Sequence, residues 1–153
     1  MKSTFLALLL AVLAVGTMQG QAAVRKKQFN LESGIAIQGY DPVSYFVLGK
    51  ATKGTSNYGT TYEGVGYYFA SASNRDLFLK DPKKYEPQYG GWCAYAMGAT
   101  NDKVEIDPET FKIVNGKLYL FFHNWVNNTL TKWNKNETNL KMQADKNWLL
   151  IAK

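Results

Sequence analysis

The stretch YYFASASNRDLFLKDPKKYEPQYGGWCAYAMG, residues 67–98, holds the densest set of structural signals in a chain of 153 residues. Its aromatic start is typical of a strand, and Ser71 or Ser73 then predicts the N-cap of a helix. We expect Leu77 and Phe78 to face the core from that helix. The stretch ends with a Gly-Gly pair, the chain's only cysteine and a short apolar run, so it also raises the question of whether Cys93 is a metal ligand, a nucleophile or a packed side chain.

A short helix and a hairpin are expected on the N-terminal side of this stretch. Asp41 followed by Pro42 is typical of a helix N-cap with proline in the first turn, and Gly49 predicts where that helix ends. Residues 58–62 and 67–70 resemble the two strands of a hairpin, because a turn containing two glycines separates them.

On the C-terminal side, a second short helix and a clear hairpin are expected. Residues 92–97 predict a helix of fewer than two turns, closed by Gly98. Asn115-Gly116 lies between the apolar runs 112–114 and 118–122. An Asn-Gly pair in that setting predicts a hairpin with a two-residue type I′ turn.

The C-terminal third, from Trp125 to Leu150, has apolar residues at helical spacing. It fits one broken or two short amphipathic helices, interrupted near residues 134–136. The sequence has no internal repeat and no interdomain linker. The predicted fold class is therefore α+β: a single compact domain with a small antiparallel sheet or hairpins, several short helices and a C-terminal amphipathic helical segment.

The N-terminus has the pattern of a signal peptide over residues 1–22. Lys2 provides the positive charge, and the apolar run 5–15 is shorter than the roughly 20 residues that cross a bilayer. We expect cleavage after Ala22, which leaves no transmembrane segment and places the protein in the periplasm or outside the cell. Residues 23–33 are expected to be a flexible N-terminal segment, and residues 34–153 to form the domain.

Charge and cysteine content exclude several classes of function. The formal net charge is +6, but the lysines are scattered along the chain and mostly flank turns. A solvated basic surface explains this pattern better than a nucleic-acid groove, and export also argues against nucleic acid. A single cysteine in an oxidising compartment makes no disulfide within the chain, so the core alone must hold the domain together.

The order of these pieces resembles the YHS domain family, in its exported bacterial form. The matching blocks agree in order and spacing over nearly all of the expected mature chain: GYDPVSYF (39–46), the opening stretch (67–98), DPETFKIVNGKLYLFF (107–122) and ADKNW (144–148). Shorter metal-binding relatives carry cysteines that bind soft metals such as copper or zinc. The resemblance places those cysteines at Ser44, Ala70 and Asn74, and none of the three is a cysteine here.

A soft-metal site is nevertheless a candidate elsewhere in the chain. If residues 92–97 are helical, Cys93 and Met97 share one face, and thiolate plus thioether suits a copper-like ion. His123, the only histidine, is the candidate third ligand. The competing interpretation is that Cys93 and Met97 simply fill the core, as both residue types commonly do. A third interpretation is a nucleophilic Cys93 with His123 as its base.

We therefore expect an exported, non-enzymatic YHS-like binding domain. Its ligand would be a soft, copper-like metal ion or a small molecule, bound near Cys93. The alternative is a structural or protein-interaction module that binds no metal and presents its basic, aromatic surface to a partner. A thiol-dependent enzyme is the minor alternative. No nucleotide-binding loop, Ser/His/Asp motif or dithiol pair is found in the sequence.

Overall fold

The computed structural model describes residues 20–152 and has the α+β architecture that the sequence predicts. The strands are β1 (Leu31–Glu32), β2 (Ile35–Ala36), β3 (Thr55–Tyr62), β4 (Val65–Phe69), β5 (Asp107–Val114), β6 (Lys117–Phe121), β7 (His123–Asn124) and β8 (Asn127–Asn128). After a helical segment at residues 20–28, the helices are α2 (Ser44–Val47), α3 (Ala72–Lys80), α4 (Pro82–Tyr85), α5 (Ala94–Ala99), α6 (Thr129–Lys135) and α7 (Glu137–Ile151). Two 3-10 turns, η1 (Ile37–Gly39) and η2 (Gln88–Gly91), connect them.

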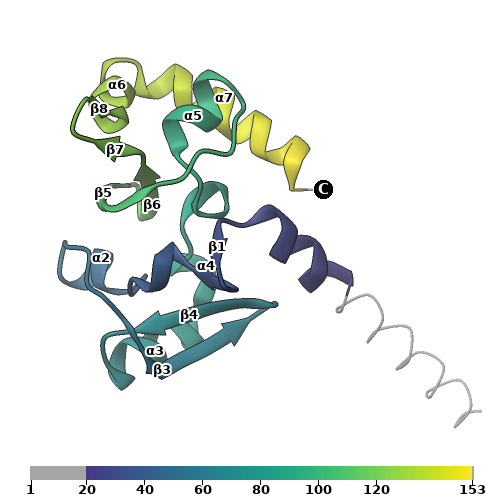
Figure 1. Ribbon diagram of the computed structural model, residues 1–153, viewed down its shortest axis with the longest axis vertical. Coiled ribbons are helices and arrows are strands. Elements are labelled where there is room, and N and C mark those ends of the chain that lie inside the picture. The colour runs from purple at the N-terminus through teal and green to yellow at the C-terminus, as the bar shows by residue number, and fades with distance from the viewer. Residues whose placement is uncertain (1–19, 153) are drawn as a thin grey trace, which may run out of the picture.

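Figure 1 shows the first sheet with α3 at one end of the molecule and α5, α6 and α7 at the other. The first sheet has the order β1-β2-β4-β3. Strands β3 and β4 are antiparallel, as expected, whereas β2 pairs with β4 in parallel through Ile35 and Gly66. The sheet is therefore mixed rather than purely antiparallel.

The turns of the β5–β6 and β3–β4 hairpins both have positive φ values at their two central residues. Asn115 and Gly116 have φ values of 50° and 71°, the positive values of a type I′ turn, so the predicted hairpin β5–β6 is confirmed. Glu63 and Gly64 form a similar turn between β3 and β4, with φ values of 45° and 85°. Strands β3 and β4 are longer than the predicted strands at residues 58–62 and 67–70.

The C-terminal third forms two helices, α6 and α7, with the break at Asn136. This confirms the expected interruption. The prediction was wrong at its start, because Trp125 belongs to the turn of a small hairpin, β7–β8, and not to a helix. The Asn124 side chain accepts the N–H groups of Val126 and Asn127, and this local bonding competes with a helix start.

The N-cap of α3 is Ser71, one of the two residues predicted for it, and its hydroxyl accepts the N–H of Asn74 at 3.2 Å. Phe78 is fully buried, but Leu77 is 37% exposed, so its predicted inward orientation was wrong. Successive residues of a helix point about 100° apart. This nine-residue helix packs against β3 and β4 along one narrow stripe, which Phe78 occupies beside Tyr67 and Phe69.

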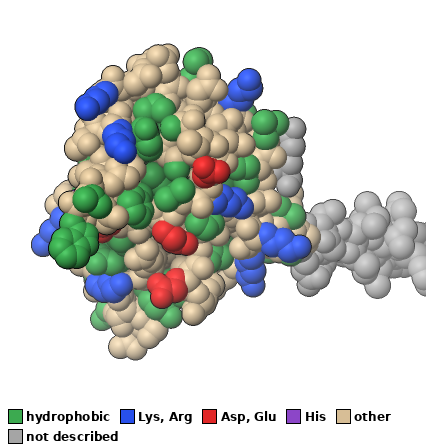
Figure 2. Space-filling view, turned by 45° about the horizontal axis from the view of Figure 1, so that its top comes forward, with side chains coloured by type: hydrophobic (Ala, Val, Ile, Leu, Met, Phe, Trp, Pro, Cys, Tyr) green, Lys and Arg blue, Asp and Glu red, His purple; other side chains and the backbone are tan. Residues whose placement is uncertain are grey.

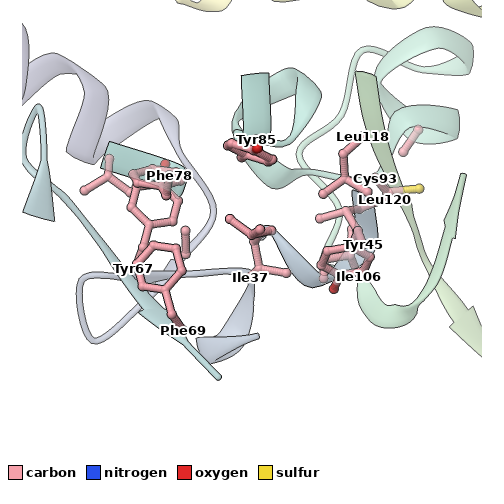
Figure 3. Packing of buried hydrophobic residues seen from close by; sticks show 14 residues of the cluster. Ile37, Tyr45, Tyr67, Phe69, Phe78, Tyr85, Cys93, Ile106, Leu118 and Leu120 are labelled. Atoms are coloured by element: carbon pink, nitrogen blue, oxygen red, sulfur yellow. The ribbon is translucent and has the colours of Figure 1, made fainter. Parts of the chain in front are cut away.

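The core consists of two clusters of buried side chains. The first joins the sheet to β6, and Figure 3 shows Ile37 and Tyr85 between the rings of Tyr67, Phe69 and Phe78 and the group around Leu118. The second cluster lies between α5, β6 and the two C-terminal helices: Tyr89, Ala94, Met97, Tyr119, Phe121, Trp133 and Ala144. Helix α5 contributes side chains to both clusters.

The N-terminal segment is in contact with the rest of the fold. Residues 1–19 of the predicted signal peptide lie outside the described residues, and residues 20–28 are helical. Within the segment 23–33, expected to be flexible, Arg25 forms ion pairs with Glu63 and Glu86. Phe29 packs edge-on against Trp148 of α7 at 6.2 Å between ring centroids. From residue 20 to residue 152, no helix is long and apolar enough to span a membrane.

Gly98 lies inside α5 rather than closing it, which corrects the predicted end of that helix. A Cβ at this position would overlap the Leu140 carbonyl oxygen and lie 3.1 Å from the carbonyl carbon. The absence of a side chain at Gly98 therefore lets α5 and α7 approach closely.

We expect Gly98→Ala to lower the free energy of unfolding by about 2 kcal/mol, because the new methyl group meets backbone that cannot move aside locally. In an uncrowded helix, the same change stabilises by about 1 kcal/mol. Urea unfolding followed by circular dichroism measures the difference. The exposed neighbour Ala99→Gly serves as control and should cost about 1 kcal/mol or less; a stabilised Gly98→Ala variant would contradict the close α5–α7 contact.

Candidate functional site

Cys93 is fully buried at the N-terminal end of α5. Its backbone N–H donates to the Val104 carbonyl at 3.0 Å. The Phe122 N–H donates to Sγ at 3.3 Å, and Oγ1 of Thr129 lies 3.4 Å from Sγ. In Figure 3 the sulfur points away from Tyr67, Phe69 and Phe78. The thiol thus occupies a hydrogen-bonded position where α5, the end of β6 and the start of α6 meet.

The other two predicted ligands have different surroundings. Met97 is fully buried in the second cluster, whereas Cys93 packs in the first. The side chain of His123 is 43% exposed, and its Nδ1 lies 3.2 Å from Oδ2 of Asp107. The backbone N–H of Phe122, the residue before His123, therefore contacts the Cys93 sulfur. Nδ1 of His123 instead contacts Thr110 and Asp107. The soft-metal site stays a prediction.

The contacts of His123 form a small polar cluster that the sequence did not reveal. The Thr110 hydroxyl donates to Oδ2 of Asp107 at 2.8 Å and lies 3.1 Å from Nδ1 of His123. The predicted strand began at residue 112, whereas β5 begins at Asp107, which pairs with Phe121 across the hairpin. Across residues 20–152, no group of three His, Cys, Asp or Glu side chains is arranged to hold a metal ion.

A second polar centre surrounds the carboxylate of Asp41, which is completely buried. Its Oδ1 accepts the N–H groups of Val43 at 2.8 Å and Ser44 at 3.3 Å. Its Oδ2 accepts the N–H of Ala70 at 2.9 Å and the side-chain amide of Asn74 at 2.6 Å. This carboxylate therefore links the start of α2, the end of β4 and the first turn of α3.

The same centre gathers the three positions at which the YHS resemblance placed metal-binding cysteines. Ser44 and Asn74 touch each other, since the Asn74 amide lies 3.3 Å from the Ser44 hydroxyl oxygen, and Ala70 contributes its backbone N–H. A soft cation needs thiolate, thioether or imidazole lone pairs. The groups at these positions present N–H donors and one hydroxyl, so they do not fit such an ion.

The comparison with protein families decides the identity of this region. The family model of the YHS domain matches residues 43–89. The chain contains a YHS domain. The match spans α2 to η2 and includes Ser44, Ala70 and Asn74, while Cys93 and His123 lie beyond it. A search of curated proteins and a search of solved structures each found no match.

The YHS domain has a partly buried ion pair, between Arg25 and Glu86, where the N-terminal segment meets it. Glu86 accepts hydrogen bonds from Arg25 and from the Tyr67 hydroxyl. Burial raises the pKa of Tyr67 well above its usual value, and the Glu86 carboxylate raises it further. A cavity of about 280 Å³ opens beside this pair, between the N-terminal segment and Trp148 of α7. Cys93 is not among its lining residues, so this space is not the predicted ligand site near Cys93.

Among the residues that the structure describes, the most exposed large apolar side chains belong to the turn of the β7–β8 hairpin, which lies outside the YHS domain. Trp125 is fully exposed, at 101% relative accessibility, and Val126 is 92% exposed. The Asn124 side chain accepts the N–H groups of Val126 at 3.2 Å and Asn127 at 2.9 Å, which fixes the turn. At the hairpin base, the Thr129 N–H donates to the Phe122 carbonyl at 3.0 Å.

The burial of Cys93 predicts an unreactive thiol. In the native protein, we expect alkylation by iodoacetamide at pH 7.5 to be at least about 100-fold slower than in the urea-unfolded chain, because the reagent reaches the sulfur only through opening of the fold. Mass spectrometry of the alkylated protein measures both rates. Ala99→Cys provides an exposed thiol on the same helix as the control.

Two outcomes would contradict a packing role for Cys93. One is rapid alkylation of native Cys93, which would revive the thiol-enzyme hypothesis. The other is a one-to-one Cu(I) complex that survives a competing chelator, is lost in Cys93→Ser and is weakened in Met97→Ala; this would support the soft-metal site at Cys93, Met97 and His123.

Proposed function

We propose that the protein is an exported, non-enzymatic YHS-domain protein that docks onto a protein partner through the turn of its β7–β8 hairpin. The observation that carries this proposal is the full exposure of Trp125 beside Val126 on a turn fixed by its own hydrogen bonds. Export is supported by the apolar run at residues 5–15 and the small residues before Ala23. Cleavage after Ala22 would retain Arg25 and its contact with Glu86.

A fixed turn with an exposed tryptophan has the properties of a binding hot spot. Tryptophan is enriched among the residues that dominate protein interfaces, since one ring buries a large area with little loss of conformational freedom. Because Asn124 already holds the turn, binding would not have to order the backbone. Two large side chains on a rigid turn fit an apolar pocket on another protein.

The charge around the hairpin favours a protein pocket over an anionic lipid surface. Residues 123–128 contain no lysine or arginine, and Asp107 contacts His123 at the base of the hairpin. Peripheral membrane binding usually combines inserted apolar side chains with a polybasic patch. Figure 2 shows Lys and Arg side chains at several places on the face that it displays, with acidic side chains among them, rather than one continuous basic patch.

The metal-binding hypothesis is less well supported by the geometry. Both soft sulfur atoms are buried, and the Cys93 sulfur already accepts the Phe122 N–H. A docking role uses side chains that have no packing function within the described part of the fold. It also leaves both core clusters intact.

The proposal predicts that Trp125→Ala weakens partner binding without destabilising the fold, because the side chain is fully exposed. A photo-crosslinking amino acid at Val126 should trap one discrete protein in a periplasmic extract, and Trp125→Ala in the same chain should remove that adduct. With the purified partner, we expect Trp125→Ala to weaken binding by at least about 30-fold, the loss of about 2 kcal/mol typical of a hot spot.

The matched control is a crosslinker at Lys117, at the exposed end of the other hairpin, which should trap no adduct that depends on Trp125. Two results would contradict the proposal. The first is equal binding by the wild-type and Trp125→Ala proteins; the second is binding of the wild type to anionic phospholipid vesicles, lost in Trp125→Ala, with no protein adduct.

A further inference from the structure

The carboxylate of Asp41, just before the matched YHS region, is the point where three segments meet. They are the start of α2, the end of β4 and the first turn of α3. Both carboxylate oxygens are occupied, since each accepts two N–H groups at 2.6–3.3 Å. Asp41 and Ser44 are completely buried. The backbone of Asp41 is also bonded, because its N–H donates to the Thr52 carbonyl at 2.9 Å.

The direction of these hydrogen bonds defines the charge that the centre accepts. Every contact to the Asp41 oxygens comes from the hydrogen-bearing side of a nitrogen. A cation placed among these groups would meet the positive ends of four N–H dipoles. The carboxylate is stabilised there because charged hydrogen bonds compensate the loss of water around a buried anion.

Three of the four residues that donate to this carboxylate lie at the positions of the metal-binding cysteines implied by the YHS resemblance. Ser44, Ala70 and Asn74 come from α2, from the residue after β4 and from α3. They converge here through their N–H groups and the Asn74–Ser44 contact at 3.3 Å. The three segments therefore meet in this protein although none of these positions carries a soft-metal ligand.

We infer that Asp41 is a metal-independent structural centre, whose buried carboxylate holds together the three segments that cysteine ligands and a metal ion hold in metal-binding YHS domains. The centre is complete within the chain and needs no ion. Its fixed acceptors set the position of the first turn of α3 relative to α2. This inference does not depend on the proposed docking function.

The test compares Asp41→Asn with Asp76→Asn, which removes the same charge from an exposed carboxylate on α3. Asparagine at position 41 would turn one NH₂ group toward N–H donors, leaving buried donors without an acceptor. We expect the equilibrium constant for unfolding to rise about 100-fold or more in Asp41→Asn and to change less than about threefold in Asp76→Asn. Urea titration of each full mature chain provides these constants.

Two further measurements keep the inference falsifiable if Asp41→Asn does not fold. Asn74→Ala removes one of the four donors and should raise the unfolding constant about tenfold. Dialysis of the wild-type protein against EDTA and a Cu(I) chelator, followed by addition of Zn²⁺ or Cu(I), should leave its unfolding midpoint unchanged at every stage.

Three results would overturn the inference. Asp41→Asn could prove as stable as Asp76→Asn, or Asn74→Ala could prove as stable as the wild type. Alternatively, the purified protein could contain one equivalent of metal whose removal lowers the midpoint and whose return restores it.

Discussion

Four N–H groups point at the carboxylate of Asp41, and the arrangement of the YHS domain follows from that convergence. The carboxylate sets the end of β4 and the start of α3 at fixed positions. Phe69 and Phe78 extend from these two elements, and their ring centroids lie 5.2 Å apart. The aromatic part of the first cluster is therefore adjoined by a polar centre at Asp41. The centre that we infer for this domain contains no metal.

In the C-terminal part of the chain, close approach between the backbones of α5 and α7 determines the packing. Gly98 lets α5 pack on α7, and Cys93 at the start of the same helix bonds to the backbone of Phe122. These contacts join the two core clusters and place the β7–β8 hairpin at the surface. Because the hairpin turn is fixed by Asn124, its exposed tryptophan is presented by a rigid support. This exposed turn on a hydrogen-bonded support is the basis of the docking function that we propose.

Strong local signals predicted much of this fold, and long-range pairing explains what they missed. Asn115-Gly116, the Ser71 cap and the helix break at Asn136 were all evident in the sequence, because each depends on residues that are close along the chain. The exposure of Trp125 was not predicted, since the apolar spacing favoured a helix there. The centre at Asp41 was predicted only in its local part. Asp41 was expected to be the N-cap of a helix, whereas Val43 occupies the N-cap position of α2 and the Asp41 carboxylate accepts the N–H groups of Val43 and Ser44. Its bonds to Ala70 and Asn74 span 29 and 33 residues and were not predicted.

Amide hydrogen exchange of chelator-treated protein tests the central claim most directly. If Asp41 holds the YHS domain without metal, the N–H groups of Val43, Ser44 and Ala70 will exchange only through global unfolding, at the rate of the most protected core amides. Adding Zn²⁺ or Cu(I) will leave these rates unchanged. Fast exchange at the three amides in the metal-free protein, slowed by either ion, would contradict the account.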